Sequence, residues 1–387
     1  MMVRQRGRGP GWSRRETVKL LSLGTVSLAV ACRGGSVQDS MPPGTGVPKA
    51  ATGTGAGAGP SVFPDGAIVR TILADVAPNT LSHGAVLFHE HLSLNTSFWD
   101  RLLGEARADQ REMFLGSPAA PYFMQDVDVM VAEMQTAARA GVAAIVDGGH
   151  ADMGRSLEFL HEVSEKSGMP IIASGGYYTD PFIPPELADQ TDDEIAEALA
   201  QSAAAERWGA FGEIASSAEI TPAERKVFRA IAKAHLATNM PIFTHTANGL
   251  EAEAQLDIFE SLGVPSAHVV IGHLGGLDDP EATVHRAIAA RGAFVGFDRV
   301  NWDAMLEDEK RVAMVTALVD AGHADKLVLA SDFYRRTELK AEGGPGYAKT
   351  VTRFASLLRE AGLDEATVQS FIADNPRRWL AFQPTTA

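Results

Sequence analysis

The chain has 387 residues, of which 45% are hydrophobic and 21% charged, a composition typical of a globular protein. The formal net charge is −15; residues 1–31 contribute +5, which leaves −20 for the rest. So acidic a surface repels phosphate backbones and argues against nucleic acid as the normal partner. The single cysteine, Cys32, excludes an intrachain disulfide and a cysteine-rich zinc site, so any metal must be held by His, Asp and Glu.

Residues 1–32 are predicted to be an export signal. A basic start leads into Ser13-Arg14-Arg15-Glu16-Thr17-Val18-Lys19, and the paired arginines resemble a twin-arginine signal. This signal predicts a periplasmic or cell-envelope location. The apolar stretch that follows, 20–30, is too short to span a membrane. Cys32 ends a lipoprotein-like processing site, where lipidation would anchor the chain to a membrane; plain signal cleavage is the alternative.

Residues 33–66 are rich in Gly, Pro, Ser, Thr and Ala, which predicts a flexible, disordered linker. It connects the signal to one domain, 67–387.

In that domain short apolar runs alternate with Ala-rich stretches of helical periodicity. The strand-like runs are 86–88, 143–146, 171–173, 210–212, 242–244, 269–271, 293–297 and 327–330. The helical stretches include 126–140, 194–207, 222–238, 251–262 and 309–321. The repeat predicts an α/β fold, a closed (β/α)8 TIM barrel. The alternative, an open doubly wound sheet, would usually carry a glycine fingerprint after its first strand, which is absent from this sequence.

Potential metal ligands follow several of these runs, at the strand ends where barrels gather functional side chains. His89 and His91 lie two residues apart, so in a strand they share one face and can reach one ion, while Glu90 points away. Later runs end at Glu213, His245, His273 and Asp332. An isolated strand-end histidine is more often an ordinary polar residue, but the full set suits two ions with Glu213 between them.

From His89 onward the chain resembles the phosphotriesterase family of the amidohydrolase superfamily. The resemblance is carried by Phe88-His89-Glu90-His91-Leu92, Pro241-Ile242-Phe243-Thr244-His245-Thr246, Ile271-Gly272-His273, Ser331-Asp332 and Arg335-Arg336-x-x-Leu339-Lys340-x-x-Gly343-Gly344-x-Gly346-Tyr347. It implies that His89, His91 and Asp332 hold a buried ion. It further implies that His245 and His273 hold a more exposed ion, and that Glu213 and a hydroxide bridge the two.

Glu213 departs from most of the family, which uses a carboxylated lysine as the bridge. A smaller subgroup, the phosphotriesterase homology proteins, resembles this chain in using glutamate. The departure favours lactones and other esters as substrates and leaves phosphotriesters as a side activity. The resemblance is also compatible with a homodimer.

The sequence therefore predicts a binuclear metal-dependent hydrolase acting on ester bonds of small molecules, a lactonase or carboxylesterase. The metal-bridging hydroxide would attack the substrate, and Asp332 would be the catalytic proton acceptor. Zinc is the favoured metal, with manganese, cobalt or iron as alternatives. Two other functions stay open, a metal-dependent nuclease on a similar barrel and an exported protein that binds metal or ligand without turnover.

Four residues near strand ends are weaker candidates for substrate contact. His150 is the first, although a hydrogen-bonding role is the commoner one for such a histidine. Tyr178 could orient a substrate oxygen or simply pack in the wall. Arg299 could contact substrate or the neighbouring Asp298. Arg335 could meet a phosphate or carboxylate of the substrate, and an ion pair within the protein is the slightly favoured alternative.

Overall fold

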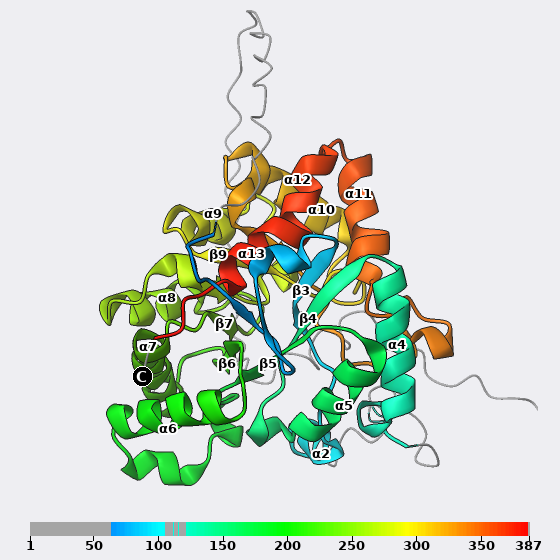
Figure 1. The fold of residues 1–387 in the computed structure, drawn as a ribbon. Helices are drawn as coiled ribbons and strands as arrows, with labels where there is room; N and C mark the ends of the chain where they lie inside the picture. Colours follow the sequence, from blue (N-terminus) through cyan, green and yellow to red (C-terminus); the bar gives the residue numbers. More distant parts are fainter. Residues whose placement is uncertain (1–62, 105–110, 112–114, 116–120, 386–387) are drawn as a thin grey trace, which may run out of the picture.

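The computed structural model describes residues 63–104, 111, 115 and 121–385, and in this part of the chain eight parallel strands form one sheet in sequential order (Figure 1). The strands are β3 Ala85–Glu90, β4 Val142–Asp147, β5 Ile171–Gly175, β6 Ala210–Ala215, β7 Ile242–His245, β8 Val269–Ile271, β9 Phe294–Phe297 and β10 Leu327–Leu329. Every predicted run overlaps one of them, and the predicted (β/α)8 barrel is confirmed. The predicted signal, 1–32, and most of the predicted linker lie outside the described residues.

Helices cover the outside of the barrel and follow the strands in turn (Figure 1). They are α4 Val127–Arg139, α5 Leu157–Ser167, α6 Asp192–Ala205, α7 Pro222–Thr238, α8 Ala252–Ser261, α9 Thr283–Ala290 and α10 Asp308–Asp320, then α11 Ala355–Glu360, α12 Glu365–Gln369 and α13 Asn375–Leu380. Helix α7 shows why its bounds were predictable. Thr221 and Glu224 form a capping box, Pro222 occupies the first turn, and Asn239 ends the helix in a left-handed conformation. None of the described helices has the length and apolar character needed to cross a membrane.

The interior of the barrel is filled by inward side chains such as Val86, Phe88 and Phe243, which pack with Trp379 of α13. The Trp379 indole donates a hydrogen bond to Ile242 O at the start of β7, so α13 covers the N-terminal end of the barrel. A short hairpin, β1 Val69–Arg70 and β2 Asp75–Val76, lies beside α13 at this end (Figure 1). The opposite end, where the predicted ligands lie, is left open for a site.

Glu90 closes the barrel where β10 meets β3. The Asp332 N–H donates to His89 O at 3.1 Å, and the His91 N–H donates to Phe333 O at 3.1 Å. Between these bonds the buried Glu90 carboxylate accepts the Ser331 N–H at 2.9 Å, the Ser331 hydroxyl at 2.7 Å and the Phe333 N–H at 2.9 Å. Glu90 is therefore turned into the seam, and it anchors both residues that flank Asp332.

Candidate metal centre

Irregularities in β3 and β6 turn two predicted ligands into the barrel. Val86 and Phe88 face the interior core, so strict alternation would send His89 outward. The register with β4 shifts between Leu87 and Glu90, and His89 faces inward directly after Phe88. In β6 the register with β7 shifts between Phe211 and Ile214, which are both packed on the outer side, and the shift brings Glu213 inside.

Gly212 makes the β6 irregularity possible. Its φ of +155° lies in the region that favours glycine, and a Cβ there would lie 2.2 Å from Phe243 Cδ1. The Gly212–Glu213 peptide bond is cis.

The first ligand group comes from β3, β6 and the residue after β10. His89 Nε2 lies 3.4 Å from Glu213 Oε2, and His91 Nε2 lies 3.3 Å from Glu213 Oε1. Asp332 Oδ1 lies 3.3 Å from His91 Nε2 and 3.9 Å from His89 Nε2. Two ligands that share one tetrahedral zinc at about 2.0–2.2 Å are roughly 3.3–3.6 Å apart. The spacing of this group therefore fits a single ion better than direct hydrogen bonds.

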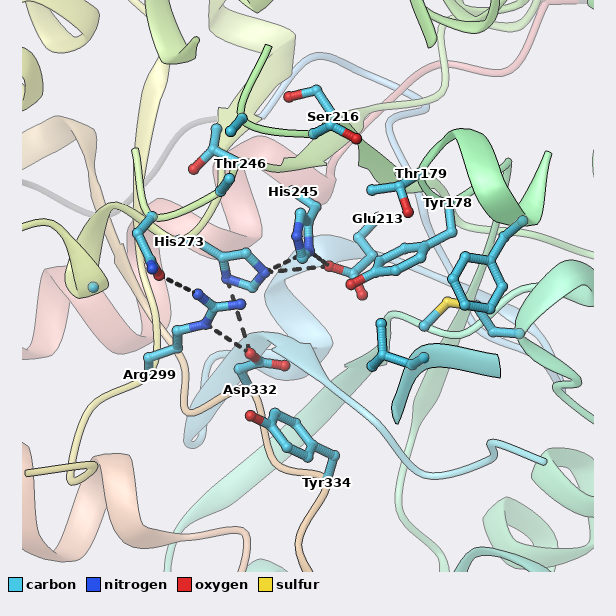
Figure 2. A pocket seen from close by; sticks show the side chains of 18 of the residues that line it. Tyr178, Thr179, Glu213, Ser216, His245, Thr246, His273, Arg299, Asp332 and Tyr334 are labelled. Carbon is cyan, nitrogen blue, oxygen red and sulfur yellow. Dashed lines mark hydrogen bonds and ion pairs between the residues drawn. The ribbon is translucent and has the colours of Figure 1, made fainter. Parts of the chain in front are cut away.

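The second group, His245 and His273, meets the same carboxylate (Figure 2). His245 Nδ1 lies 2.8 Å from Glu213 Oε2, and His273 Nε2 lies 3.4 Å from that oxygen. The two ring nitrogens are 2.8 Å apart. The His245 side chain keeps 13% of its surface exposed, whereas His89 is fully buried. The second group is thus the one nearer to solvent, and the Glu213 carboxylate is common to both groups.

Asp298, the first residue after β9, orients one histidine in each group. Its Oδ2 accepts the His89 ring Nδ1–H at 3.0 Å and the His273 N–H at 3.1 Å, and its Oδ1 accepts the His273 ring Nδ1–H at 3.0 Å. When these rings are neutral, each Nε2 therefore carries a lone pair directed at a carboxylate oxygen, and the buried Nε2 of His89 has no hydrogen-bond partner among the described residues. A cation between these groups removes the repulsion, so the residues fit a metal.

The sequence analysis named Asp298 only as a neighbour that Arg299 could contact, and its role toward His89 and His273 was missed. The available signal was its place at the end of a strand, which it shares with the predicted ligands.

The charge state of the centre suits divalent cations. Burial raises the pKa of Glu213, but the charge that His89 carries when protonated and the hydrogen bonds from His245 and His273 hold it well below its usual range. Burial likewise opposes ionisation of Asp332, but the nearby His91, His273 and Arg299 side chains hold its pKa well below normal. Burial lowers the pKa of His245 to about 4, so this ring is neutral, the form in which imidazole binds metals. Buried groups of His, Glu and Asp in this centre could hold metal ions.

A cavity of about 640 Å³ opens over the centre and is bounded largely by apolar and aromatic side chains. They include Phe98 and Trp99 of α2 Thr96–Leu103, together with Phe182, Leu250 and Leu277. Such a cavity is large enough for a small organic substrate.

Two of the predicted substrate residues face this cavity (Figure 2). The Tyr178 ring packs edge-on against His245, with 5.0 Å between ring centroids. Arg299 donates from Nε to Asp332 Oδ2 at 3.0 Å and from Nη1 to Asn248 Oδ1 at 2.5 Å. Both residues therefore touch the candidate centre as well as the cavity.

The other two predicted substrate residues, His150 and Arg335, are not among the described residues that line the cavity. His150 is buried behind Glu213 and donates to its backbone oxygen at 3.1 Å. Arg335 donates to Glu338 Oε1 at 2.6 Å and stacks over the Trp302 ring at 4.1 Å. Their contacts support hydrogen-bonding and ion-pairing roles within the protein.

Comparisons with known proteins agree with this geometry. The model of the phosphotriesterase family matches residues 68–380. The phosphotriesterase homology protein of Escherichia coli (strain K12) is 32% identical over 304 residues, covering 77% of this chain and 98% of that protein. Its crystal structure, complexed with phosphate in the active site, has a TM-score of 0.69 at 30% identity and covers 77% of this chain and 99% of that one.

Two relatives of lower identity are named for the reaction that they catalyse. The N-acetyltaurine hydrolase of Salmo salar is 26% identical over 347 residues, covering 81% of this chain and 98% of that protein. The crystal structure of a lactonase from Listeria monocytogenes has a TM-score of 0.69 at 26% identity, covering 81% of this chain and 98% of that one.

Proposed function

The chain belongs to the phosphotriesterase family, and on this basis we propose that it is a binuclear metal-dependent hydrolase of carboxylic esters, with lactones as the favoured substrates. The observation that carries the proposal is the position of the Glu213 carboxylate. Four histidine nitrogens surround it at 2.8–3.4 Å, with His91 against Oε1. His89, His245 and His273 lie against Oε2.

We assign each ion its ligands from this arrangement. His89, His91 and Asp332 would hold the buried ion, His245 and His273 the more exposed one, and Glu213 would contact both. When bound, the ions supply an activated water as nucleophile and polarise the substrate oxygen. Nitrogen and carboxylate ligands favour zinc, with manganese, cobalt or iron as alternatives.

Asp332 would act as the catalytic proton acceptor. Its Oδ1 faces His91 in the ligand group, while its Oδ2 is held by Arg299 Nε at 3.0 Å. The guanidinium thus fixes the orientation of the carboxylate at the floor of the cavity and favours its ionised form. A carboxylate so held can take a proton from the attacking water and pass it to the leaving oxygen.

The cavity wall supports a neutral organic substrate. The Tyr178 ring beside His245 is placed to contact a substrate near the exposed group. The lactonase among the structural relatives supports lactones, and the N-acetyltaurine hydrolases make an amide the main competing substrate class.

A parallel substrate screen tests the proposal. Apoprotein reconstituted with zinc would be assayed against lactones, aryl esters, phosphotriesters and N-acetyltaurine. We expect lactone or ester cleavage that requires zinc and is lost in Asp332→Asn. A protein that holds two zinc ions per chain and cleaves none of these substrates would instead be the non-catalytic binder, and cleavage of single-stranded DNA at physiological salt would revive the nuclease.

Location is a separate proposal, because the predicted signal and Cys32 lie outside the described residues. We propose export by the twin-arginine-type signal and attachment of lipid at Cys32. Fractionation of cells that produce the full chain or Cys32→Ser tests this. A membrane fraction that is unchanged in Cys32→Ser would contradict the anchor.

A further inference from the structure

We propose that His150, held by Asp152, is a positioning residue that fixes Glu213 at the metal centre and ties it to the cavity wall. This inference rests on the proposed function, in which Glu213 lies between two ions. His150 would act through Glu213, without contacting substrate or metal.

The segment after β4 binds both polar groups of the Glu213 backbone. The Glu213 N–H donates to Gly148 O at 3.3 Å, and His150 Nε2 donates to Glu213 O at 3.1 Å. Gly148 in the same segment lies close to the first ligand group, since a Cβ added to Gly148 would be only 3.0 Å from the His89 ring. The backbone from which the bridging carboxylate projects is therefore fixed by contacts from this one segment.

Asp152 sets the orientation of the imidazole. One of its carboxylate oxygens accepts from His150 Nδ1, and the other accepts the Tyr178 N–H at 2.8 Å. Because Glu213 O and the Asp152 carboxylate are both acceptors, both ring nitrogens of His150 donate. The Asp152–His150 pair thus connects the Tyr178 backbone to Glu213, and the Tyr178 ring lies against His245.

A purely structural role explains these contacts less well. His150 is 1% exposed, and a buried ion pair contributes little net stability compared with apolar side chains of similar volume. By contrast, loss of a hydrogen-bond partner that orients a metal ligand typically weakens metal binding by roughly 10–100-fold.

Zinc affinity, measured by competition with a chelator, separates the two roles. In His150→Leu the donor to Glu213 O is lost, and we expect zinc to bind roughly 10–100-fold more weakly. In His150→Gln the amide can still donate to Glu213 O, and we expect much of the affinity to return. His235 provides matched controls, because it is also buried and donates to a backbone oxygen, Met240 O at 2.7 Å, far from the centre. We expect His235→Leu and His235→Gln to bind zinc as the wild type does.

Thermal unfolding of the apoproteins is measured in parallel. The inference is overturned if His150→Leu binds zinc with wild-type affinity. It is also overturned if His150→Leu and His235→Leu are equally destabilised and His150→Leu loses no more zinc affinity than His235→Leu. If His150→Leu does not fold, Asp152→Asn carries the test: a tenfold loss of zinc affinity supports the inference and wild-type affinity refutes it.

Failure of the proposed function would look different. A wild-type protein that binds no zinc, or binds it equally well after Glu213→Gln, contradicts the metal centre itself. Zinc binding that depends on Glu213 and is indifferent to His150 and Asp152 contradicts only the positioning role.

Discussion

Replacement of Asp298 by asparagine should weaken one metal position and spare the other. Asp298 Oδ2 accepts two donors, the His89 Nδ1–H at 3.0 Å and the His273 N–H at 3.1 Å, whereas Oδ1 accepts only the His273 Nδ1–H. An asparagine has a single accepting oxygen. We expect the amide oxygen to take the place of Oδ2, where it accepts from two donors. The amide nitrogen then takes the place of Oδ1 and faces the His273 ring.

The magnitude follows from what happens to His273. The amide N–H would oppose the ring N–H, and the clash is relieved when the ring proton moves to Nε2. That tautomer has no lone pair for an ion at Nε2. Loss of one such orienting partner costs roughly 10–100-fold in metal affinity, or about 1.4–2.8 kcal/mol. His89 keeps its acceptor, so the loss falls on the more exposed ion.

Calorimetric titration of apoprotein with zinc, in competition with a chelator, measures both positions. We expect two tight sites in the wild type, and in Asp298→Asn one tight site and one weakened by the factor above. Asp308→Asn is the matched control, since Asp308 is a buried carboxylate that accepts from Arg311 and Asn301 outside the ligand groups. Equal weakening of both sites in Asp298→Asn, or no weakening at all, would refute the reasoning.

Three further changes have defined outcomes. Gly212→Ala places a methyl group against Phe243 at a strained φ and should cost about 3 kcal/mol or more in the free energy of unfolding, measured with urea. Arg299→Met removes a charged donor from Asp332 and should lower kcat/KM roughly 10–100-fold with zinc content unchanged. Burial lowers the pKa of His235 in the folded protein to about 4. As pH falls below about 6.5, the unfolded chain therefore binds a proton at this histidine before the folded protein does. Between pH 8 and pH 5 the wild type should thus lose about 2 kcal/mol in the free energy of unfolding that His235→Gln does not lose.

Each of these has a contradicting result. Gly212→Ala with wild-type stability would mean that β6 can relax away from Phe243. Loss of zinc from Arg299→Met would show that the guanidinium supports binding and not the chemical step. An equal fall in stability with pH in wild type and His235→Gln would exclude His235 as its source.

The strand order and the residues that meet at the candidate centre could be predicted from the sequence, because the βα repeat and the strand ends are local patterns. The direction of His89 could not, since alternation from Val86 and Phe88 sends it outward and only the register shift against β4 turns it in. Asp298 was missed because its partner His89 lies 209 positions away. The two-residue strands β1 and β2 are too short to show any periodicity.

In the basic loop after β10, the ion pairing that the sequence analysis slightly favoured for Arg335 is present. Arg335 and Lys349 both donate to the Glu338 carboxylate, at 2.6 and 2.8 Å. Tyr347, at the end of the glycine-rich motif, donates its hydroxyl to His91 O at 2.7 Å. The Tyr347 contact makes the loop a support for His91, a predicted metal ligand, and Arg335 is paired with Glu338 and is not among the described residues that line the cavity.

The cations that remain at the cavity also argue for an uncharged substrate. Among the described lining residues the arginines are Arg299, which is paired with Asp332, and Arg101, which stacks at 4.4 Å over the Phe182 ring and donates to Pro181 O. With zinc bound at the centre, an anionic group that lies farther out in the cavity, such as the sulfonate of N-acetyltaurine, would find no spare guanidinium to pair with. We therefore expect zinc-loaded protein to cleave neutral lactones with a kcat/KM at least tenfold above that for N-acetyltaurine. The reverse order would show that charge pairing in the cavity does not control the choice of substrate.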